Sequence, residues 1–114
     1  MLYELRIYHM YPGRLEAIHK RFREATLRLF EKHGIRVCDF FTDAGDTETI
    51  YYICSFEDRA HRDRAFEAFG NDPEWKAVYS ASHADGGPIV EKIDSYFMTR
   101  VPYCTPAWNQ GPSA

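Results

Sequence analysis

The stretch TIYYICSF at residues 49–56 decides the fold, because six of its eight residues are β-branched or aromatic. That composition predicts a β-strand. The preceding stretch, IRVCDFFT at residues 35–42, has the same character and predicts a second strand. Only turn-forming residues around 43–46 separate the two stretches. We therefore expect residues 35–56 to form a β-hairpin.

Toward the N-terminus, the stretch YELRIYHM at residues 3–10 alternates in character and predicts another strand, with Leu5 and Ile7 on one face. Its other face carries Arg6, Tyr8 and Met10. Residues 14–33 predict a long amphipathic helix that ends at Gly34. Its apolar stripe consists of Leu15, Ile18, Phe22, Ala25, Leu29 and Phe30. The charged side that we expect to face solvent consists of Arg14, Lys20, Arg21, Glu24, Arg28, Glu31 and Lys32.

Beyond the hairpin, Ser55 and Asp58 have the spacing of a helix capping box, which predicts a helix over about residues 56–69. We expect this helix to bury Ala65, Phe66 and Phe69 and to end at Gly70. Asp72 followed by Pro73 predicts the start of a further short helix that reaches about Ser82.

A fourth strand is predicted over residues 89–98. The order β-α-β-β-α-(α)-β predicts an α+β, ferredoxin-like βαββαβ fold, in which helices cover one face of a four-stranded antiparallel sheet. We expect residues 1–100 to form this single domain and residues 101–114 to form a C-terminal tail.

Apolar residues on both faces of the predicted sheet suggest that neither face is left to solvent. In a regular hairpin one face would carry Cys38, Phe40, Ile50, Tyr52, Cys54 and Phe56, and the other Val37, Phe41, Tyr51 and Ile53. In the fourth strand the two sets are Ile89, Ile93 and Phe97 against Val90, Tyr96 and Met98. Since two helices cover only one face, something else must cover the second.

Two covers for that face are open. A second copy of the chain could place the same face against it around a two-fold axis, which would produce a dimeric α/β barrel. Alternatively, the tail could fold back across the sheet with Tyr103 and Trp108. We favour the homodimer.

Composition excludes several classes of protein. The 114 residues are 45% hydrophobic and carry a net charge of −3, which is typical of a globular domain and does not indicate nucleic-acid binding. No apolar run is long enough for a membrane span. The three cysteines form no CxxC motif, and the first residues do not resemble a signal peptide, so we expect free thiols and a cytoplasmic location.

Three landmarks resemble the NIPSNAP family of small dimeric α/β-barrel proteins. They are YELRIY at residues 3–8 followed by Pro12-Gly13, the hairpin with its arginine-rich helix (Asp58, Arg59, Arg62), and Phe69 followed by DPEW at 72–75. The resemblance covers about residues 2–98. Residues 37–40, Val-Cys-Asp-Phe, depart from the glycine and aromatic character that we expect in the family at this point.

The resemblance implies a ferredoxin-like fold and a dimer, but it implies no particular reaction. The wider group of dimeric α/β barrels includes cofactor-independent monooxygenases, so the resemblance leaves two functions open. One is a protein, enzyme or not, that binds a small apolar or aromatic ligand in the barrel. The other is an assembly module whose barrel is filled by side chains.

Eight residues form the candidate pocket on this interpretation: Arg6, Tyr8, Phe40, Tyr52, Trp75, His83, Tyr96 and Met98. Arg6 either binds an anion or carbonyl, or forms a structural salt bridge with Glu4, Glu91 or Asp94. The tyrosines either bond a ligand oxygen or pack in a core. His83 is the candidate general base. Trp75 would lie at the rim.

No sequence motif assigns a cofactor or a metal. The five histidines have no metal-binding spacing, and there is no Walker loop, GxGxxG motif or serine elbow. We therefore expect no metal and no cofactor, and the sequence leaves open whether the protein is an enzyme.

Overall fold

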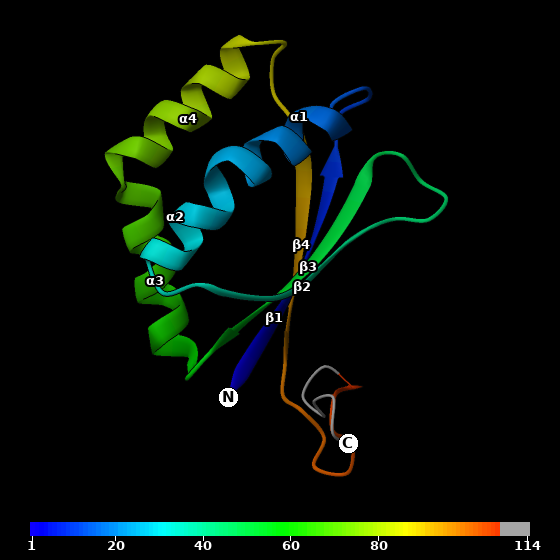
Figure 1. Ribbon diagram of the computed structural model, residues 1–114, viewed down its shortest axis with the longest axis vertical. Coiled ribbons are helices and arrows are strands. Elements are labelled where there is room, and N and C mark those ends of the chain that lie inside the picture. Colours follow the sequence, from blue (N-terminus) through cyan, green and yellow to red (C-terminus); the bar gives the residue numbers. More distant parts are fainter. Residues whose placement is uncertain (108–114) are drawn as a thin grey trace.

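A computed structural model describes residues 1–107 and has the expected ferredoxin-like α+β fold (Figure 1). The elements are β1 (Leu2–Met10), α1 (Leu15–Arg21), η1 (Phe22–Thr26), α2 (Leu27–Lys32), β2 (Arg36–Thr42), β3 (Thr49–Phe56), α3 (Arg59–Asn71), α4 (Pro73–Ala84) and β4 (Val90–Met98). The four strands form one antiparallel sheet in the order β2-β3-β1-β4. The strand that carries Arg6 is therefore central.

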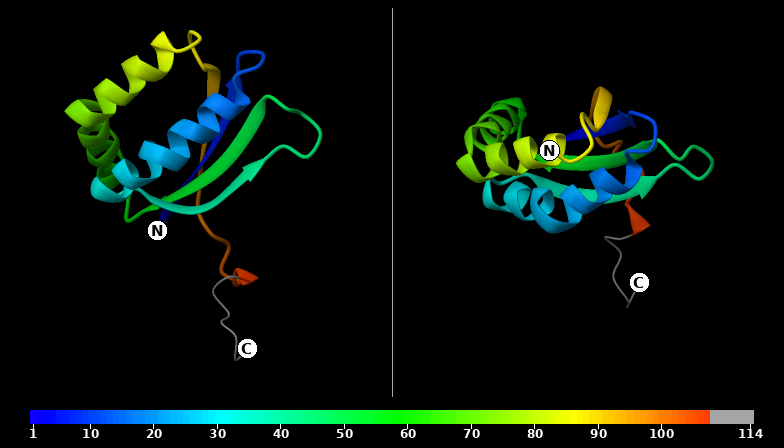
Figure 2. Two further views of the ribbon diagram at one scale, coloured as in Figure 1. Left: turned by 45° about the horizontal axis from the view of Figure 1, so that its top comes forward. Right: turned by 90° about the horizontal axis from the view of Figure 1, so that it is seen from above.

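The helices lie together on one side of the sheet, as both views in Figure 2 show. The core fills the space between the two layers, with Ile18, Leu29, Phe30, Ile50, Tyr52 and Phe56 each at most 2% exposed. From α3, Ala65 and Phe69 are buried as expected and Phe66 is half-buried. Burial of this apolar surface is the main force that holds the helices on the sheet.

The long helix predicted over residues 14–33 is observed over residues 15–32, but its middle turn, η1, is a π-helix. In this turn the Thr26 hydroxyl donates a hydrogen bond to the Arg21 carbonyl oxygen at 3.2 Å. A π turn accommodates one extra residue, and such turns often occur at functional sites. The apolar periodicity that predicted the helix gives no sign of this wider turn.

The predicted capping box at Ser55 is wrong. Ser55 pairs with Tyr3 on one side and Arg36 on the other, so strand β3 continues through Phe56. The N-cap of α3 is Asp58, whose carboxylate accepts a hydrogen bond from the His61 backbone N–H at 2.8 Å.

The end of α3 that was predicted at Gly70 is one residue early, because the helix continues to Asn71. The predicted cap at Asp72 is correct, since its carboxylate accepts from the Glu74 N–H at 2.8 Å.

Two β-bulges change the predicted register. One lies between Val37 and Asp39, so Val37, and not Cys38, is paired with Cys54. The bulge falls in the segment where the sequence departs from the family pattern. The other lies between His9 and Met10, and it places Val90 beside Met10 on the helix side. The regular alternation assumed from sequence therefore put Val37 and Val90 on the wrong face.

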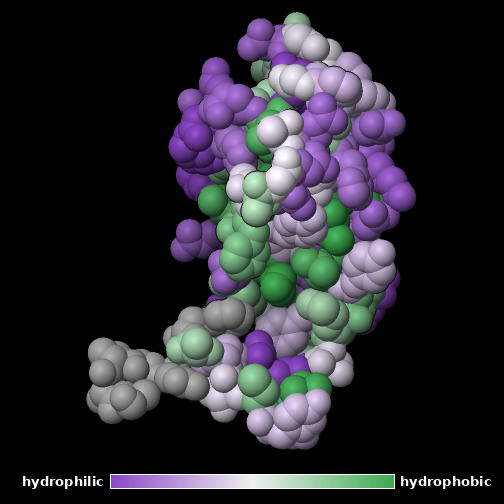
Figure 3. Space-filling view, turned by 90° about the vertical axis from the view of Figure 1, so that its right-hand side faces the viewer, coloured by the Kyte–Doolittle hydropathy of each residue, from purple (hydrophilic) through white to green (hydrophobic). Residues whose placement is uncertain are grey.

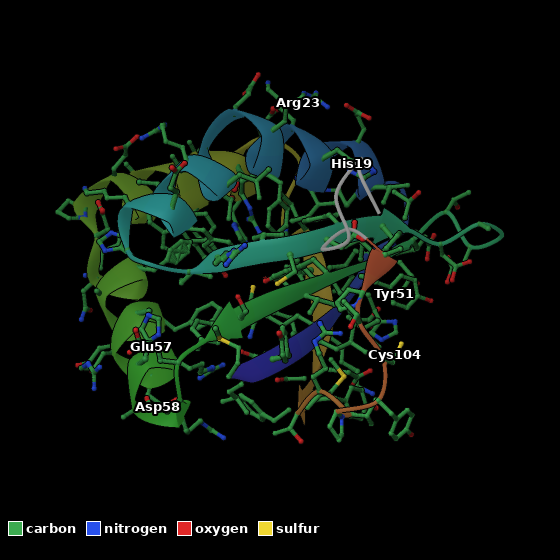
Figure 4. All side chains as sticks on the ribbon, turned by 60° about the horizontal axis from the view of Figure 1, so that its bottom comes forward. His19, Arg23, Tyr51, Glu57, Asp58 and Cys104 are labelled. Atoms are coloured by element: carbon green, nitrogen blue, oxygen red, sulfur yellow. The ribbon has the colours of Figure 1, made fainter. Side chains whose placement is uncertain are left out.

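The sheet face away from the helices remains apolar after this correction. In register, Leu5, Ile53 and Tyr96 share it, as do Ile7 and Tyr51. Phe41 and Tyr96 are 50% and 54% exposed. Figure 3 shows hydrophobic side chains gathered in the middle of this side. Figure 4 shows Tyr51 across the sheet from His19 and Arg23 of the helical layer. We call this surface the open face.

The described part of the tail, residues 101–107, does not cover the open face as a strap. It leaves the end of β4 and runs down from the sheet in Figure 1, and Tyr103 is 86% exposed. Trp108, the other residue considered for this cover, lies outside the described residues.

Candidate functional site

A cavity of about 280 Å³ lies between the sheet and the helical layer. Strand β1 contributes Arg6 and Tyr8, and β4 contributes Val90 and Ile93. The remaining lining comes from the helices: Arg21, Phe22, Thr26, Phe30, Phe66, Phe69, Gly70, Trp75 and Tyr79. We call this space the inner cavity. Its walls are mainly aromatic, and its lining includes two arginines and no carboxylate.

Arg6 is held at the cavity by an ion-pair network around Glu4, which has no exposed surface. The Glu4 carboxylate accepts from Arg6 Nη1 at 2.9 Å, from Arg62 Nε at 2.9 Å and from the Ser95 hydroxyl at 2.6 Å. Burial raises the pKa of Glu4, but the hydrogen bonds from Arg62 and Ser95 and the charge of Arg6 outweigh it, so the net pKa is lowered. Glu4 is therefore the partner of Arg6 among the three considered from sequence.

Tyr8 and Tyr52 complete the polar end of the cavity. Arg6 Nε donates to the Tyr52 hydroxyl at 2.7 Å, and the Tyr8 and Tyr52 hydroxyls are 2.8 Å apart. Burial raises the pKa of Tyr52 well above its usual value, so this phenol stays protonated. Phe40 stacks on Tyr52 with ring centroids 5.2 Å apart and fixes the ring. The three polar side chains form one connected network in which Arg6 and Tyr8 line the cavity.

Arg21 was expected on the solvent side of its helix but is only 8% exposed. Helix α4 covers it, because Arg21 lies over the rings of Trp75 and Tyr79, at 5.2 and 5.5 Å from their centroids. A spacing signal existed in the sequence: Arg21 follows Ile18 by three positions and precedes Ala25 by four. Sequence reasoning missed it because the position of α4 was not known.

The other predicted pocket residues lie elsewhere. In register, Tyr96 pairs with Leu5 and Met98 with Tyr3, so both belong to the open face. His83 is on α4, where its Nδ1 is 2.8 Å from the Tyr79 carbonyl oxygen, and it does not line the inner cavity. Of the eight candidates, Arg6, Tyr8 and Trp75 line the cavity, and Tyr52 and Phe40 support them.

Within residues 1–107, no three histidine, cysteine or acidic side chains come together in a way that could hold a metal ion. Burial raises the pKa of the Cys54 thiol to about 12, so this cysteine is unreactive at neutral pH. None of the helices described has both the length and the apolar character needed to cross a bilayer.

Similar folds occur in solved structures of low sequence identity. An uncharacterized NIPSNAP domain protein from Burkholderia xenovorans is 21% identical, with a TM-score of 0.77, over 93% of this chain and 100% of its own. A NIPSNAP family protein of unknown function from Agrobacterium tumefaciens is 20% identical, with a TM-score of 0.78, over 91% of both chains. A putative antibiotic biosynthesis monooxygenase from Nitrosomonas europaea is 13% identical, with a TM-score of 0.61, over 89% of this chain and 99% of its own.

No curated protein matches the chain significantly. The family model of NIPSNAP matches residues 3–105, which include every described strand and helix apart from Leu2 at the start of β1, and every residue that lines the inner cavity. The fold, the landmarks in the sequence and this match agree, and the chain belongs to the NIPSNAP family.

Proposed function

We propose that the protein binds a small, flat, largely apolar organic molecule in the inner cavity, with an oxygen of that molecule at Arg6 and Tyr8. The observation that carries this proposal is the combination of aromatic walls with one connected polar end. Pockets for small organic ligands have this character, with a few fixed polar groups in an apolar wall. The volume of about 280 Å³ suits a molecule of one or two fused rings.

The polar end has hydrogen-bonding capacity left for a ligand. A guanidinium has five N–H donors, and Arg6 uses three of them, on Tyr52, Glu4 and Tyr8. The Tyr8 hydroxyl can both donate and accept. Because Glu4 and Tyr52 already fix Arg6, a phenol, enol or quinone oxygen would meet donors that need no rearrangement.

A second candidate is oxygenation of the bound molecule, which the likeness to proteins described as antibiotic biosynthesis monooxygenases favours. In such a step an ionised enol or phenol with an adjacent CH₂ group would react with O₂. One oxygen atom would become a new carbonyl on that carbon, and the other would leave as water with the two hydrogens. Arg6 and Tyr8 would stabilise the oxyanion from which the electrons leave.

The proposal extends to the assembly: two copies pair through their open faces and form a dimeric barrel. The half-exposed side chains of Phe41 and Tyr96 support this, because a contiguous apolar surface of this kind is rare on a monomer. In this arrangement each chain keeps its own inner cavity, since the cavity lies on the helix side of the sheet. The alternative function, an assembly module without a ligand, needs only the dimer.

Native mass spectrometry of freshly purified protein, followed by calorimetric titration with 2-naphthol, tests the ligand proposal. We expect a mass excess that disappears on denaturation, and binding of 2-naphthol that Tyr8→Phe weakens about 3- to 10-fold, since a neutral hydrogen bond contributes about 0.5–1.5 kcal/mol. Tyr11→Phe, which alters a tyrosine outside the cavity lining, is the matched control. A clean dimer with no bound molecule and no affinity for 2-naphthol would support the assembly module instead.

A further inference from the structure

We propose that the ligand of the inner cavity is a carboxylate or similar organic anion, and that Arg21 binds its charged group. This inference rests on the proposed ligand binding and names the chemical class of the ligand. It concerns a residue on the opposite layer from Arg6, since Arg21 comes from the helices and Arg6 from the sheet.

Arg21 is a buried cation without an acidic partner among residues 1–107. Its Nε atom is buried and has no hydrogen-bond partner in the described part of the chain. Its Nη1 donates to the Ser82 hydroxyl at 3.2 Å, which is a neutral group. The rings of Trp75 and Tyr79 stabilise the charge from their faces but do not neutralise it. An unpaired charge held away from water is costly, and proteins rarely keep one without a use.

Arg14, the N-cap residue of α1, provides a contrast. Its Nη2 donates to the carbonyl oxygens of Ser82, Asp85 and Gly87 at 3.0–3.2 Å, where the end of α4 supplies partial negative charge. Arg14 Nε is buried without a hydrogen-bond partner in the described residues, as Arg21 Nε is. Arg14 nevertheless has carbonyl partners through Nη2, whereas the acceptor of Arg21 is the Ser82 hydroxyl. Burial lowers the pKa of Arg21 and outweighs the opposite effect of Tyr8, Tyr79 and Tyr52, while the charge of Arg14 adds a smaller lowering.

Arg21 also lies where an anion could reach it. A second hollow, of about 510 Å³, runs between the helical segment of residues 15–32 and α4, and Arg21 lines both this groove and the inner cavity. The other charged residues of the groove are balanced in sign: Arg14, Lys20 and Arg28 against Glu16, Glu24 and Asp85. Arg21 thus provides the excess positive charge at the boundary between the two hollows.

The π turn supports this placement. It begins directly after Arg21, and its residues Phe22 and Thr26 line the inner cavity, as Arg21 does. The Thr26 hydroxyl bonds the Arg21 carbonyl oxygen, so the backbone at Arg21 is fixed by a contact that a regular helix would not need. The π turn thus fixes the backbone from which the Arg21 side chain reaches the inner cavity.

The test compares two ligands of the same shape, 2-naphthoate and its neutral amide, 2-naphthamide, by calorimetry. We expect the wild-type protein to prefer the carboxylate about 10- to 100-fold, as a charge-assisted hydrogen bond allows. Arg21→Met should abolish this preference by weakening the binding of the carboxylate far more than that of the amide, and Arg21→Lys should restore part of it. Arg23→Met removes a charge of the same sign from an exposed position two residues away and should keep the preference.

Thermal melts separate this role from a structural one. Because Arg21→Met removes an unpaired buried charge, we expect its melting temperature to equal or exceed that of the wild type. A strongly destabilised variant that still prefers the carboxylate would show a structural role and overturn the inference. Equal binding of both ligands by the wild type would overturn it too, while leaving the ligand proposal intact. Failure of both ligands to bind would count against the ligand proposal itself.

Discussion

At the scale of single residues, Glu4 shows how a buried carboxylate organises the site. It has no exposed surface, and it joins a sheet arginine, Arg6, to a helix arginine, Arg62. The same carboxylate therefore fixes the polar end of the inner cavity and ties α3 to the sheet. A buried ion pair contributes little net stability against apolar residues of the same volume, but loss of one partner leaves the other charge unpaired.

Glu4→Gln should therefore destabilise the protein by about 3–5 kcal/mol, because Arg6 and Arg62 lose their shared counter-ion. Urea denaturation at neutral pH measures this loss. Glu67→Gln, on the exposed side of α3, is the control and should change the free energy of unfolding by less than about 0.5 kcal/mol.

The effect of Glu4→Gln should also depend on pH. The folded-state pKa of Glu4 lies below its ordinary value of 4.5, so its contribution to stability is fully present above that pH and is lost as the pH falls through the folded pKa. The difference in free energy of unfolding between wild type and variant should therefore become smaller on acidification from about pH 7 to pH 3. A difference that stays constant over this range would mean that folding does not change the pKa of Glu4, and one that widens on acidification would mean that Glu4 is protonated in the folded protein.

At the scale of elements, the connection from α4 to β4 depends on a close approach of backbone and side chain. Gly86 has a φ of +102°, and a Cβ atom built there would lie 2.6 Å from Arg14 Nη1. Gly87 has a similar φ of +90° but open space around its Cβ position. At both positions a residue with a Cβ atom would be strained by the positive φ. Only at Gly86 would that Cβ atom also displace Arg14.

Gly86→Ala should consequently cost more stability than Gly87→Ala. Each substitution carries about 1–2 kcal/mol of strain for a left-handed residue. Gly86→Ala also disturbs the Arg14 hydrogen bonds to the end of α4, which adds about 1–3 kcal/mol. Melting curves of the two variants provide the measurement, and equal losses would show that Arg14 moves aside without cost.

Local patterns predicted the strands and helices well, because alternation, apolar stripes and caps such as Asp72 act over a few residues. They failed where an extra residue enters an element, at the bulge after Val37, the bulge before Met10 and the π turn of residues 22–26. Each of these is stabilised by partners distant in sequence or by a single side-chain contact. A periodic pattern of apolar residues extends over many positions, so it does not show where one extra residue enters the element.

At the scale of the whole molecule, the inner cavity depends on how α4 packs over the helical segment of residues 15–32. The sequence identified Arg6, Tyr8 and Trp75 as candidates because they combine polar and aromatic character with predicted strands and helices. It could not separate them from Tyr96 and Met98, since the face of each strand residue depends on register and bulges. Arg21 was assigned to solvent because burial by a second helix is a property of the assembled fold.

The proposed dimer can be tested by its mass and by a substitution on the open face. Light scattering should give a mass twice the 13.3 kDa of one chain, and Tyr96→Lys should weaken the dimer at least about 100-fold, because a two-fold interface would bury the new charge twice. Tyr96 is 54% exposed in the single chain, so the variant should still fold. Tyr103→Lys, in the exposed tail, is the control. A monomeric wild type would refute the dimer.

The π turn of residues 22–26 affects how this chain is compared with its relatives. A relative with a regular α-helix at this place would be one residue shorter, and every helical position from Leu27 onward would be offset by one. An alignment without a gap inside the helix would then pair Arg21, or the residues after the π turn, with residues of the relative that do not occupy the same place in space. Whether a relative has the same arginine should therefore be decided by superposing structures and not by counting positions.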